Sequence, residues 1–330
     1  MTFTEDIRNI IGTEWTGFET LLSKELESRS VLLNRINSYV LGTSGKRLRP
    51  LLALVTAKAC GGSVNLKAVA CAAVSELIHN ATLLHDDVVD GSDMRRGKLT
   101  VNRLFSPGVS ILVGDYWLTK AIHVLISYDC PYSVLGLYSK AIELLAEGEI
   151  LQMELADTLA AVEEDYIEVI SRKTASLFVA SVKGPAIVSG ASDKVVEAMG
   201  QFAWHLGCAF QIRDDILDYR PSSDTGKDSD CDIMERKITM PLLCAMHRNP
   251  SMEEYIRRRM ADITADPSRI AEDRKVAEEI REFVLDNGGI ESAKAKLRQY
   301  TDKASGYLEV LEPSVYRDAM KSVTDYVAGL

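Results

Sequence analysis

Two five-residue motifs, each with aspartate at its first, second and fifth positions, are the most chemically informative part of the sequence. The first is DDVVD at residues 86–90, and the second is DDILD at residues 214–218. On an α-helix, residues i and i+4 share one face and residue i+1 lies beside it, so each motif can aim at least two carboxylates at one point. All-oxygen ligation suits Mg²⁺, which usually completes its coordination shell with water and substrate phosphates. The two motifs therefore predict a diphosphate held through metal ions.

The residues around these motifs argue against a solvated helix face, which is the other common setting of aspartate-rich sequence. Leu83 and Leu84 precede the first motif, and Ile212 precedes the second. The aspartates are therefore expected in apolar surroundings, where an unpaired charge has a large desolvation penalty. Like charges in such a place need a counter-ion, so we interpret both motifs as parts of a cation-binding site.

Basic residues cluster next to the acidic motifs. Residues 45–50 (GKRLRP) place three cations before an expected helix start, and residues 95–98 (RRGK) follow the first motif within one loop. Lys173 interrupts an apolar helix, and Lys227 and Lys237 flank the loop after the second motif. Lys and Arg are the side chains that neutralise phosphate groups. Each basic group alone is typical of surface charge, but together they indicate a site for phosphorylated substrates.

Helical sequence patterns run through nearly the whole chain, and they must position these groups. The 330 residues are 46% hydrophobic, with 9 prolines and 21 glycines, and long stretches rich in Ala, Leu, Glu and Lys favour helices. We predict an all-α fold of roughly eleven or twelve helices, in a single large domain over residues 1–330. The polar loop at residues 221–232 directly follows the second motif, and we expect it to be a mobile flap beside an active site.

Composition excludes several classes of protein. A net charge of −10 argues against a nucleic-acid surface, which needs basic stripes. The six cysteines show no C-x-x-C spacing and are interpreted as reduced thiols. Residues 1–10 lack the order of a signal peptide, and no apolar run approaches the roughly 20 residues of a membrane span. We therefore expect a cytoplasmic protein, and we also consider a transient membrane contact during product release.

The strings GKRLRP, LLHDDVVDGSDMRRG, a Lys-Thr pair, FQIRDDILD and GKD…ERKITMPLL, in this order, resemble the all-trans polyprenyl diphosphate synthases, the head-to-tail isoprenyl transferases. The resemblance covers about residues 40–245. It implies an isoprenoid synthase-like helical bundle around a deep central cavity, a homodimer, and three Mg²⁺ ions. It also implies a prenyltransferase that condenses isopentenyl diphosphate with an allylic diphosphate by ionisation, condensation and elimination.

The resemblance further implies a role for each matching residue. The implied metal ligands are Asp86, Asp87, Asp90, Asp214 and Asp218, with Asp215 as a weaker candidate. Lys46, Arg49, His79 and Arg96 match the isopentenyl diphosphate site, and Arg95, Lys173, Lys227 and Lys237 match the allylic diphosphate site. Phe210 and Gln211 match the pair beside the reacting alkene, with Thr174 nearby; the implied catalytic group is the aspartates with Lys173, Thr174 and Gln211. Residues 324–330 (TDYVAGL) lack the basic tail of many relatives, which puts a carboxy-terminal role in substrate binding in doubt.

Three rival functions are weighed against this resemblance. A di-iron carboxylate bundle needs a Glu-x-x-His pattern on each of two helices, and only His79 has a glutamate, Glu76, three residues earlier. A class I terpene cyclase uses one aspartate-rich motif, and a non-catalytic regulatory subunit of a heteromeric synthase typically lacks one. Both motifs are complete here, so we favour an active transferase.

Product length is predicted from the helix that leads into the first motif. Ala81 and Thr82 lie about 6–8 Å before the aspartates along a helix, on the order of one or two isoprene units. Aromatic residues block this level in short-chain members of the family, whereas both side chains are small here. The tail is expected to pass toward Ile78 and, across the cavity, Ile122, although Trp117 could close the tunnel. We expect all-trans products longer than C20, a quinone side-chain precursor, with a short-chain farnesyl or geranylgeranyl diphosphate synthase as the alternative.

Overall fold

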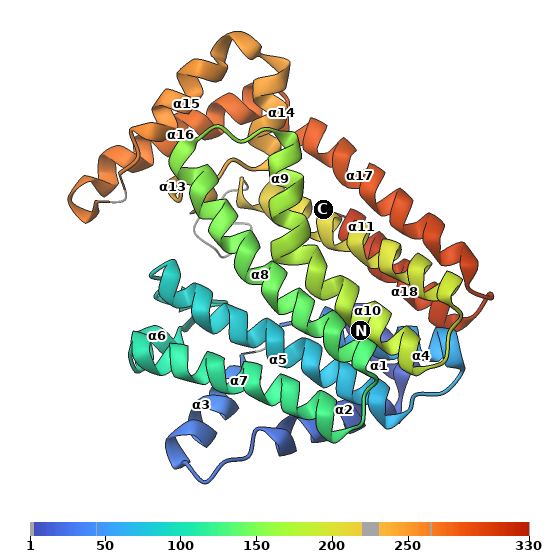
Figure 1. The fold of residues 1–330 in the computed structure, drawn as a ribbon. Coiled ribbons are helices and arrows are strands. Elements are labelled where there is room, and N and C mark those ends of the chain that lie inside the picture. The colour runs from blue at the N-terminus through green and yellow to red at the C-terminus, as the bar shows by residue number, and fades with distance from the viewer. Residues whose placement is uncertain (1–2, 44, 220–230, 265, 330) are drawn as a thin grey trace. The chain divides into compact units, whose positions relative to one another are not determined.

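The computed structural model describes residues 3–43, 45–219, 231–264 and 266–329, and helices make up almost all of its regular structure (Figure 1). This confirms the predicted all-α fold. The chain falls into two compact units, each made of several separate stretches of sequence. Unit 1 comprises residues 1–142, 177–203 and 307–323, and unit 2 comprises residues 143–176, 204–306 and 324–330.

The helices and strands of the described residues have the following bounds. The first part of the chain contains α1 (Phe3–Ile11), α2 (Thr13–Glu25), α3 (Val31–Gly42), α4 (Leu48–Gly61), α5 (Leu66–Val89), β1 (Met94–Arg95), β2 (Lys98–Leu99), α6 (Val101–Leu104) and α7 (Pro107–Ser127). The middle contains α8 (Tyr132–Thr158), α9 (Glu163–Ile170), a π-helix η1 (Ser171–Ala175), α10 (Ser176–Val188), α11 (Asp193–Asp218) and α13 (Cys231–Met234). The last part contains α14 (Met240–Arg248), η2 (Pro250–Met252), α15 (Glu253–Ala261), η3 (Pro267–Arg269), α16 (Ile270–Asp286), α17 (Gly289–Tyr307), η4 (Leu308–Val310) and α18 (Val315–Ala328).

Local sequence sets the ends of the helices that carry the first site residues. Asn65 caps α5 by accepting a hydrogen bond from the Ala68 backbone N–H at 2.9 Å, as short polar residues do at helix starts. Ser106 caps α7 in the same way, and Pro107 follows it at the first helical turn, where a missing N–H has no consequence. Gly62 ends α4 in the left-handed region at φ 70°, which favours glycine.

In unit 1, α5 is the central helix and packs against α7, α4 and α2. Its side chains are buried almost without interruption up to the first motif. The polar groups inside this core are hydrogen-bonded: the Trp117 indole Nε1 donates to Asn37 Oδ1 at 2.9 Å, and the Tyr138 hydroxyl donates to the Cys71 carbonyl at 2.9 Å. The core therefore fixes α5, and with it the first motif, against three other helices.

Helix α7 corrects one expectation. Pro107–Ser127 is 21 residues long and has a window of mean hydropathy 1.4, so length and composition alone would let it cross a membrane. The sequence reading missed this run because Asp115 and Lys120 interrupt it. In the structure 39% of the apolar window is buried, and α7 packs on α5. The buried side chains of α7, which include Val113, Trp117 and Val124, belong to the core of unit 1.

In unit 2, α16 packs against α13, α14 and α15. The fully buried side chains of this unit include Leu206, Ile212, Leu242, Ile280, Val284 and Leu297. Arg257 of α15 donates hydrogen bonds to the carbonyls of Leu159 and Ala161, the latter at 3.1 Å. These bonds hold the connection between α8 and α9 in place. Helix α9 then continues into the π-helix that carries candidate site residues.

Candidate active site

The first aspartate motif occupies the carboxyl end of α5. Asp86 is half-buried, Asp90 caps the helix and is exposed, and Asp87 is only 4% exposed. The last carbonyl groups of a helix give this end a partial negative charge. Three carboxylates at the same place therefore make it a strong attractor for cations.

Asp87 is bound by an arginine of the short β1–β2 hairpin that follows the motif. Arg95 Nε donates to Asp87 Oδ1 at 2.8 Å, and Asn102 Nδ2 donates to the Asp87 carbonyl at 3.3 Å. Burial raises the pKa of Asp87, and the Arg95 guanidinium opposes that rise. Arg95, which the sequence assigns to the allylic diphosphate, thus contacts the first motif directly.

Arginine side chains gather around His79, seven residues before the first motif on α5. Burial is the first cause that holds the pKa of His79 well below its usual value, and the charges of Arg49, Arg96 and Arg95 add to it. His79 is therefore neutral near pH 7 and can donate or accept a hydrogen bond without adding charge. The structure brings together three of the four residues expected at the isopentenyl diphosphate site, all within unit 1.

The position of Arg96 depends on a glycine in the GKRLRP segment. A Cβ atom built on Gly45 would lie 2.6 Å from the Arg96 guanidinium carbon, so any larger residue would displace this side chain. Arg96 Nη1 also donates to the Thr43 carbonyl at 3.2 Å. The fourth expected residue, Lys46, is exposed, and its carbonyl accepts from Arg8 at 3.5 Å.

Another arginine of the same segment has a structural role. Arg47 Nη1 lies 3.0 Å from Glu19 Oε1, and Arg47 Nε lies 3.6 Å from Glu76 Oε1. Glu76 is 2% exposed, so its charge is balanced by Arg47 inside unit 1. The only Glu-x-x-His pattern of the sequence is therefore engaged in a buried ion pair with an arginine.

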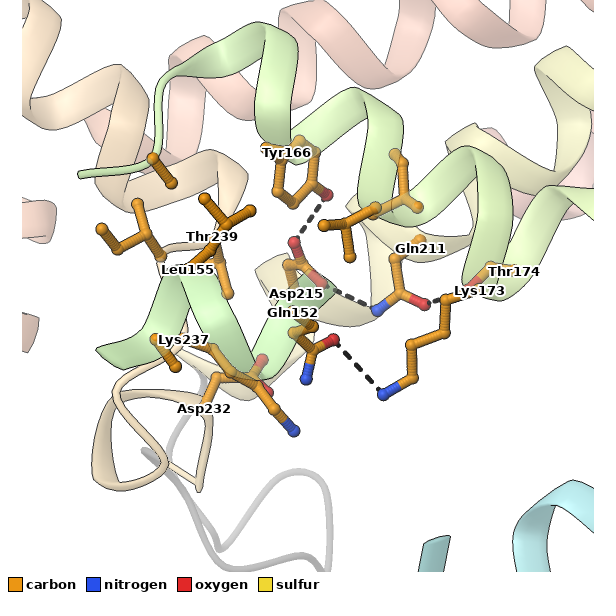
Figure 2. A pocket seen from close by; sticks show the side chains of 15 residues that line it. Gln152, Leu155, Tyr166, Lys173, Thr174, Gln211, Asp215, Asp232, Lys237 and Thr239 are labelled. Atoms are coloured by element: carbon orange, nitrogen blue, oxygen red, sulfur yellow. Dashed lines mark hydrogen bonds between the residues drawn. The ribbon is translucent and has the colours of Figure 1, made fainter. Parts of the chain in front are cut away.

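The second aspartate motif ends α11 in unit 2. Asp215 is 2% exposed, and its carboxylate accepts hydrogen bonds from the Tyr166 hydroxyl at 2.6 Å and from Gln211 Nε2 at 2.9 Å (Figure 2). It also accepts one from the Met240 N–H at 3.5 Å. Burial is the main cause that raises the pKa of Asp215 to about 7, and the charge of Asp232 adds to it. Asp215 is thus placed as a buried acceptor between α9, α11 and α14.

The two motifs share one arrangement. In each, the second aspartate is buried and hydrogen-bonded to a residue outside the motif, whereas the first and fifth aspartates are more exposed. Those more exposed residues are Asp86 and Asp90 in unit 1 and Asp214 and Asp218 in unit 2. Residues i and i+4 share a helix face, so each motif presents one pair of carboxylates on one side.

A pocket of unit 2 contains most of the remaining expected residues. The space in it that is free of protein atoms is about 640 Å³, a volume that includes open solvent. Lys173 and Thr174 reach it from the π-helix η1, and Gln211 reaches it from α11 (Figure 2). The Thr174 hydroxyl donates to Gln211 Oε1 at 2.8 Å. Since Gln211 Nε2 is used by Asp215, both ends of this amide are fixed.

The other expected residues fall in different places. Lys237 lines the same pocket and forms an ion pair with Glu235, and Phe210 is half-buried on α11. Lys227, and most of the loop at residues 221–232, lie outside the described residues. Within the described parts of the chain, no group of three His, Cys, Asp or Glu side chains is arranged to hold a metal ion by itself.

The residues expected to set product length all lie in unit 1. Ile78 and Ala81 are fully buried on α5, and Thr82 donates its hydroxyl hydrogen bond to the His79 carbonyl at 2.8 Å. Ile122 is half-buried on α7. The Thr82 hydroxyl is thus satisfied by its own helix, which leaves its methyl group as the apolar part of the side chain.

Among the lining residues that the sequence did not predict, Tyr166 and Gln152 use their side chains to bind predicted site residues. Tyr166 donates to Asp215, and Gln152 of α8 accepts from Lys173 Nζ at 3.3 Å. Tyr166 lies seven residues before Lys173, about two turns along a helix, and this spacing was an available signal. Nothing in the sequence marks Gln152, because its partner is distant in the chain.

The end of the chain lies next to the second motif within unit 2. Arg213 Nε donates to the Gly329 carbonyl at 3.3 Å, and the Arg213 guanidinium stacks over the Tyr326 ring at 4.7 Å. Arg213 directly precedes Asp214. Residues 326 and 329 therefore contact the helix that carries the second motif.

Comparison with known proteins decides the family. The sequence model of the Polyprenyl synthetase family matches residues 30–278. The chain belongs to the polyprenyl synthetase family. This confirms the resemblance seen in the sequence, and it makes the chain an enzyme of the prenyltransferase class rather than a di-iron protein or a terpene cyclase.

Relatives cover the polyprenyl synthetase chain almost completely. Octaprenyl diphosphate synthase of Escherichia coli (strain K12) is 36% identical over 318 residues, which are 96% of this chain and 95% of the relative. The all-trans-nonaprenyl-diphosphate synthase (geranyl-diphosphate specific) of Rhodobacter capsulatus is 34% identical over 98% of this chain and 96% of its own. A crystal structure of polyprenyl synthase from Caulobacter crescentus CB15, complexed with calcium and isoprenyl diphosphate, matches with TM-score 0.90 and 29% identity over 99% and 98% of the two chains.

Proposed function

We propose that this polyprenyl synthetase condenses isopentenyl diphosphate with an allylic diphosphate to give an all-trans polyprenyl diphosphate longer than C20, a precursor of a quinone side chain. The observation that carries the proposal is the repeated arrangement of the two aspartate motifs, each with one buried and two more exposed carboxylates. The relatives that make octaprenyl and nonaprenyl diphosphates support the length.

The donor set fits Mg²⁺, and we propose three ions when diphosphate is bound. Asp86 with Asp90, and Asp214 with Asp218, offer hard oxygen ligands in pairs, which suits an ion that takes one or two carboxylates plus substrate phosphates. When bound, Mg²⁺ would stabilise the negative charge that develops on the departing diphosphate. Asp87 and Asp215 are then the supporting residues, because their oxygens already accept hydrogen bonds from Arg95 and Tyr166.

The cationic residues fall into two sets according to the diphosphate to which we assign them. We propose that Arg49, His79 and Arg96, with Lys46, hold isopentenyl diphosphate in unit 1. Lys173 and Lys237 line the pocket of unit 2, and with Arg95 and Lys227 we assign them to the allylic diphosphate. Preorganised positive charge lowers the barrier to loss of the allylic diphosphate, since it is in place before charge develops.

The remaining steps need exclusion of water rather than a strong base. The allylic cation is attacked by the double bond of isopentenyl diphosphate, and loss of a proton gives the new trans double bond. Gln211 and Thr174 carry fixed dipoles beside the pocket, and Leu155, Val169 and Ile170 line it with apolar surface. We propose that the released diphosphate accepts the proton, and that the apolar lining protects the cation from water.

We propose that the chain acts as a cytoplasmic homodimer and as one polyprenyl synthase domain. The family match spans stretches of both units, which supports a single domain. Large apolar side chains are exposed on α7 and at the start of α8, with Leu112 69%, Ile126 60% and Tyr132 87% exposed. Exposed apolar groups of this size favour burial against a partner, and we propose a second copy of the chain.

Activity is tested with pure protein, labelled isopentenyl diphosphate, Mg²⁺ and geranyl, farnesyl or geranylgeranyl diphosphate in separate reactions. Products are sized by chromatography after removal of the diphosphate. We expect products longer than C20 that disappear when a chelator is added. Products that stop at C15 or C20 would favour a short-chain synthase. No incorporation with any primer would refute the proposal for the chain acting without another subunit.

A further inference from the structure

Helix α8 approaches the π-helix η1 so closely that only glycine fits at one position. A Cβ atom built on Gly148 would lie 2.7 Å from the Lys173 backbone nitrogen and 2.9 Å from the Arg172 Cβ. It would also lie 3.2 Å from the Arg172 carbonyl carbon. These are backbone or near-backbone atoms, so a side-chain rotation cannot relieve the overlap. The absence of a side chain at residue 148 therefore sets how near the two helices lie.

The segment on the other side of this contact has unusual geometry. Residues 171–175 form a single π-helical turn between α9 and α10. Such turns widen the helix by one residue, are less stable than α-helix and are common at functional sites. This turn carries Lys173 and Thr174, which both line the pocket of unit 2. A strained turn persists where its surroundings determine it, and α8 is part of those surroundings.

Residues on either side of Gly148 bind the side chains of the π-helix. Glu149 forms an ion pair with Lys173 Nζ, and Gln152 Oε1 accepts a hydrogen bond from the same amine at 3.3 Å (Figure 2). Glu147 Oε2 lies 2.7 Å from Arg172 Nη1. Backbone and side chains of residues 172 and 173 are therefore held by one short stretch of α8.

We propose that residues 147–152 of α8 are a positioning element for Lys173, with Gly148 setting the place of its backbone and Glu149 and Gln152 setting the direction of its amine. The inference rests on the proposed function, in which Lys173 holds the allylic diphosphate. A lysine is a point charge on a flexible stem, so its placement depends on such contacts. Small displacements of a positioning group have large effects on turnover.

The first test replaces Gly148 by alanine and uses Gly136→Ala as the matched control. Gly136 lies on the same helix, and a Cβ there would meet no atom within 4 Å. We expect Gly148→Ala to raise the KM for the allylic diphosphate by about tenfold or more, and to leave the KM for isopentenyl diphosphate within about twofold. Gly136→Ala should change neither. A change in Tm with both KM values intact would overturn the proposal, since it would mean simple helix packing.

A second test avoids the backbone and decides the matter if Gly148→Ala does not fold. Gln152→Ala is combined with Lys173→Ala in a double-mutant cycle. If Gln152 acts through Lys173, Gln152→Ala raises the allylic KM severalfold in the wild-type background and has no further effect once Lys173 is absent. Equal effects in both backgrounds would contradict the proposed route.

A binding measurement separates this inference from the proposed function. Inorganic diphosphate with Mg²⁺ is titrated by calorimetry into the wild-type protein, Gly148→Ala and Gly136→Ala. We expect weaker binding only in Gly148→Ala. A wild-type protein that binds diphosphate but makes no product would refute the condensation, whereas equal binding by all three proteins would refute the positioning role.

Discussion

At the scale of single residues, each aspartate motif divides its carboxylates between buried and more exposed positions. Asp214 is half-buried, while Asp215 is buried and accepts hydrogen bonds from Tyr166 and Gln211. The two adjacent residues should therefore fail in different ways when they are replaced.

We expect Asp214→Asn to lower turnover by about a hundredfold or more, because it removes a charged ligand for the Mg²⁺ that would stabilise the negative charge developing on the departing diphosphate. Its Tm should be unchanged or higher, since carboxylate repulsion is relieved. Asp215→Ala should instead lower the free energy of unfolding by about 1–3 kcal/mol, because Tyr166 and Gln211 lose a buried acceptor. Steady-state kinetics and thermal melts of both variants check this, and equal behaviour of the two would contradict it.

The half-buried His79 of unit 1 gives a pH prediction. The pKa of His79 is held well below its usual value by burial and by nearby arginines, so the unfolded chain binds a proton at His79 at pH values where the folded chain does not. The contribution of neutral His79 to the free energy of unfolding is therefore complete above about pH 6.5. As the pH decreases below that value, the contribution is lost by up to about 1.4 kcal/mol per pH unit. Melts of wild type and His79→Gln at pH 7.5 and 5.5 test this. Wild type should lose more stability, and identical losses would count against it.

At the scale of elements, α5 and α7 meet at a second close glycine contact. A Cβ on Gly114 of α7 would lie 2.3 Å from His85 Nε2, and His85 now lies 3.3 Å from both Asp115 Oδ1 and the Ile111 carbonyl. The missing side chain at Gly114 therefore leaves room for the ring of His85 between the two helices. His85 directly precedes the first motif.

We expect Gly114→Ala to displace His85 and lower the free energy of unfolding by about 1–3 kcal/mol through overpacking. Gly108→Ala on the same helix is the control, because no atom lies within 4 Å of a Cβ there. The control should be neutral or slightly stabilising, as alanine favours helix. Chemical denaturation measures both, and a Gly114→Ala protein as stable as the control would show that the ring moves without loss.

At the scale of the whole molecule, we predict that product length depends on how far a growing tail can extend beside α5. Ala81 is fully buried one turn before the first motif. A tyrosine there would fill about one isoprene unit of space below the aspartates. We expect Ala81→Tyr to shorten the products sharply while isopentenyl diphosphate is still consumed. Product sizing with a farnesyl primer tests this, and unchanged length in an active, folded variant would place the tail elsewhere.

The all-α fold and the family could be read from the sequence because they depend on local signals. Helical periodicity, the caps at Asn65 and Ser106, and the order of acidic and basic strings are all written in neighbouring residues. The candidate site was predicted as a set of residues for the same reason. Its chemistry requires charged side chains, and the sequence shows directly which residues are charged.

Tertiary structure decided how those residues are used. Arg95 binds Asp87, Tyr166 binds Asp215, and Gln152 binds Lys173, and the last two pairs join different helices. The π-helix likewise could not be read from residues 171–175, since a widened turn is less stable than α-helix and depends on its packing partners. Sequence alone thus determined which side chains carry charge. Contacts between residues distant in the chain determined which of these side chains are buried, because burial depends on the elements that pack against each one.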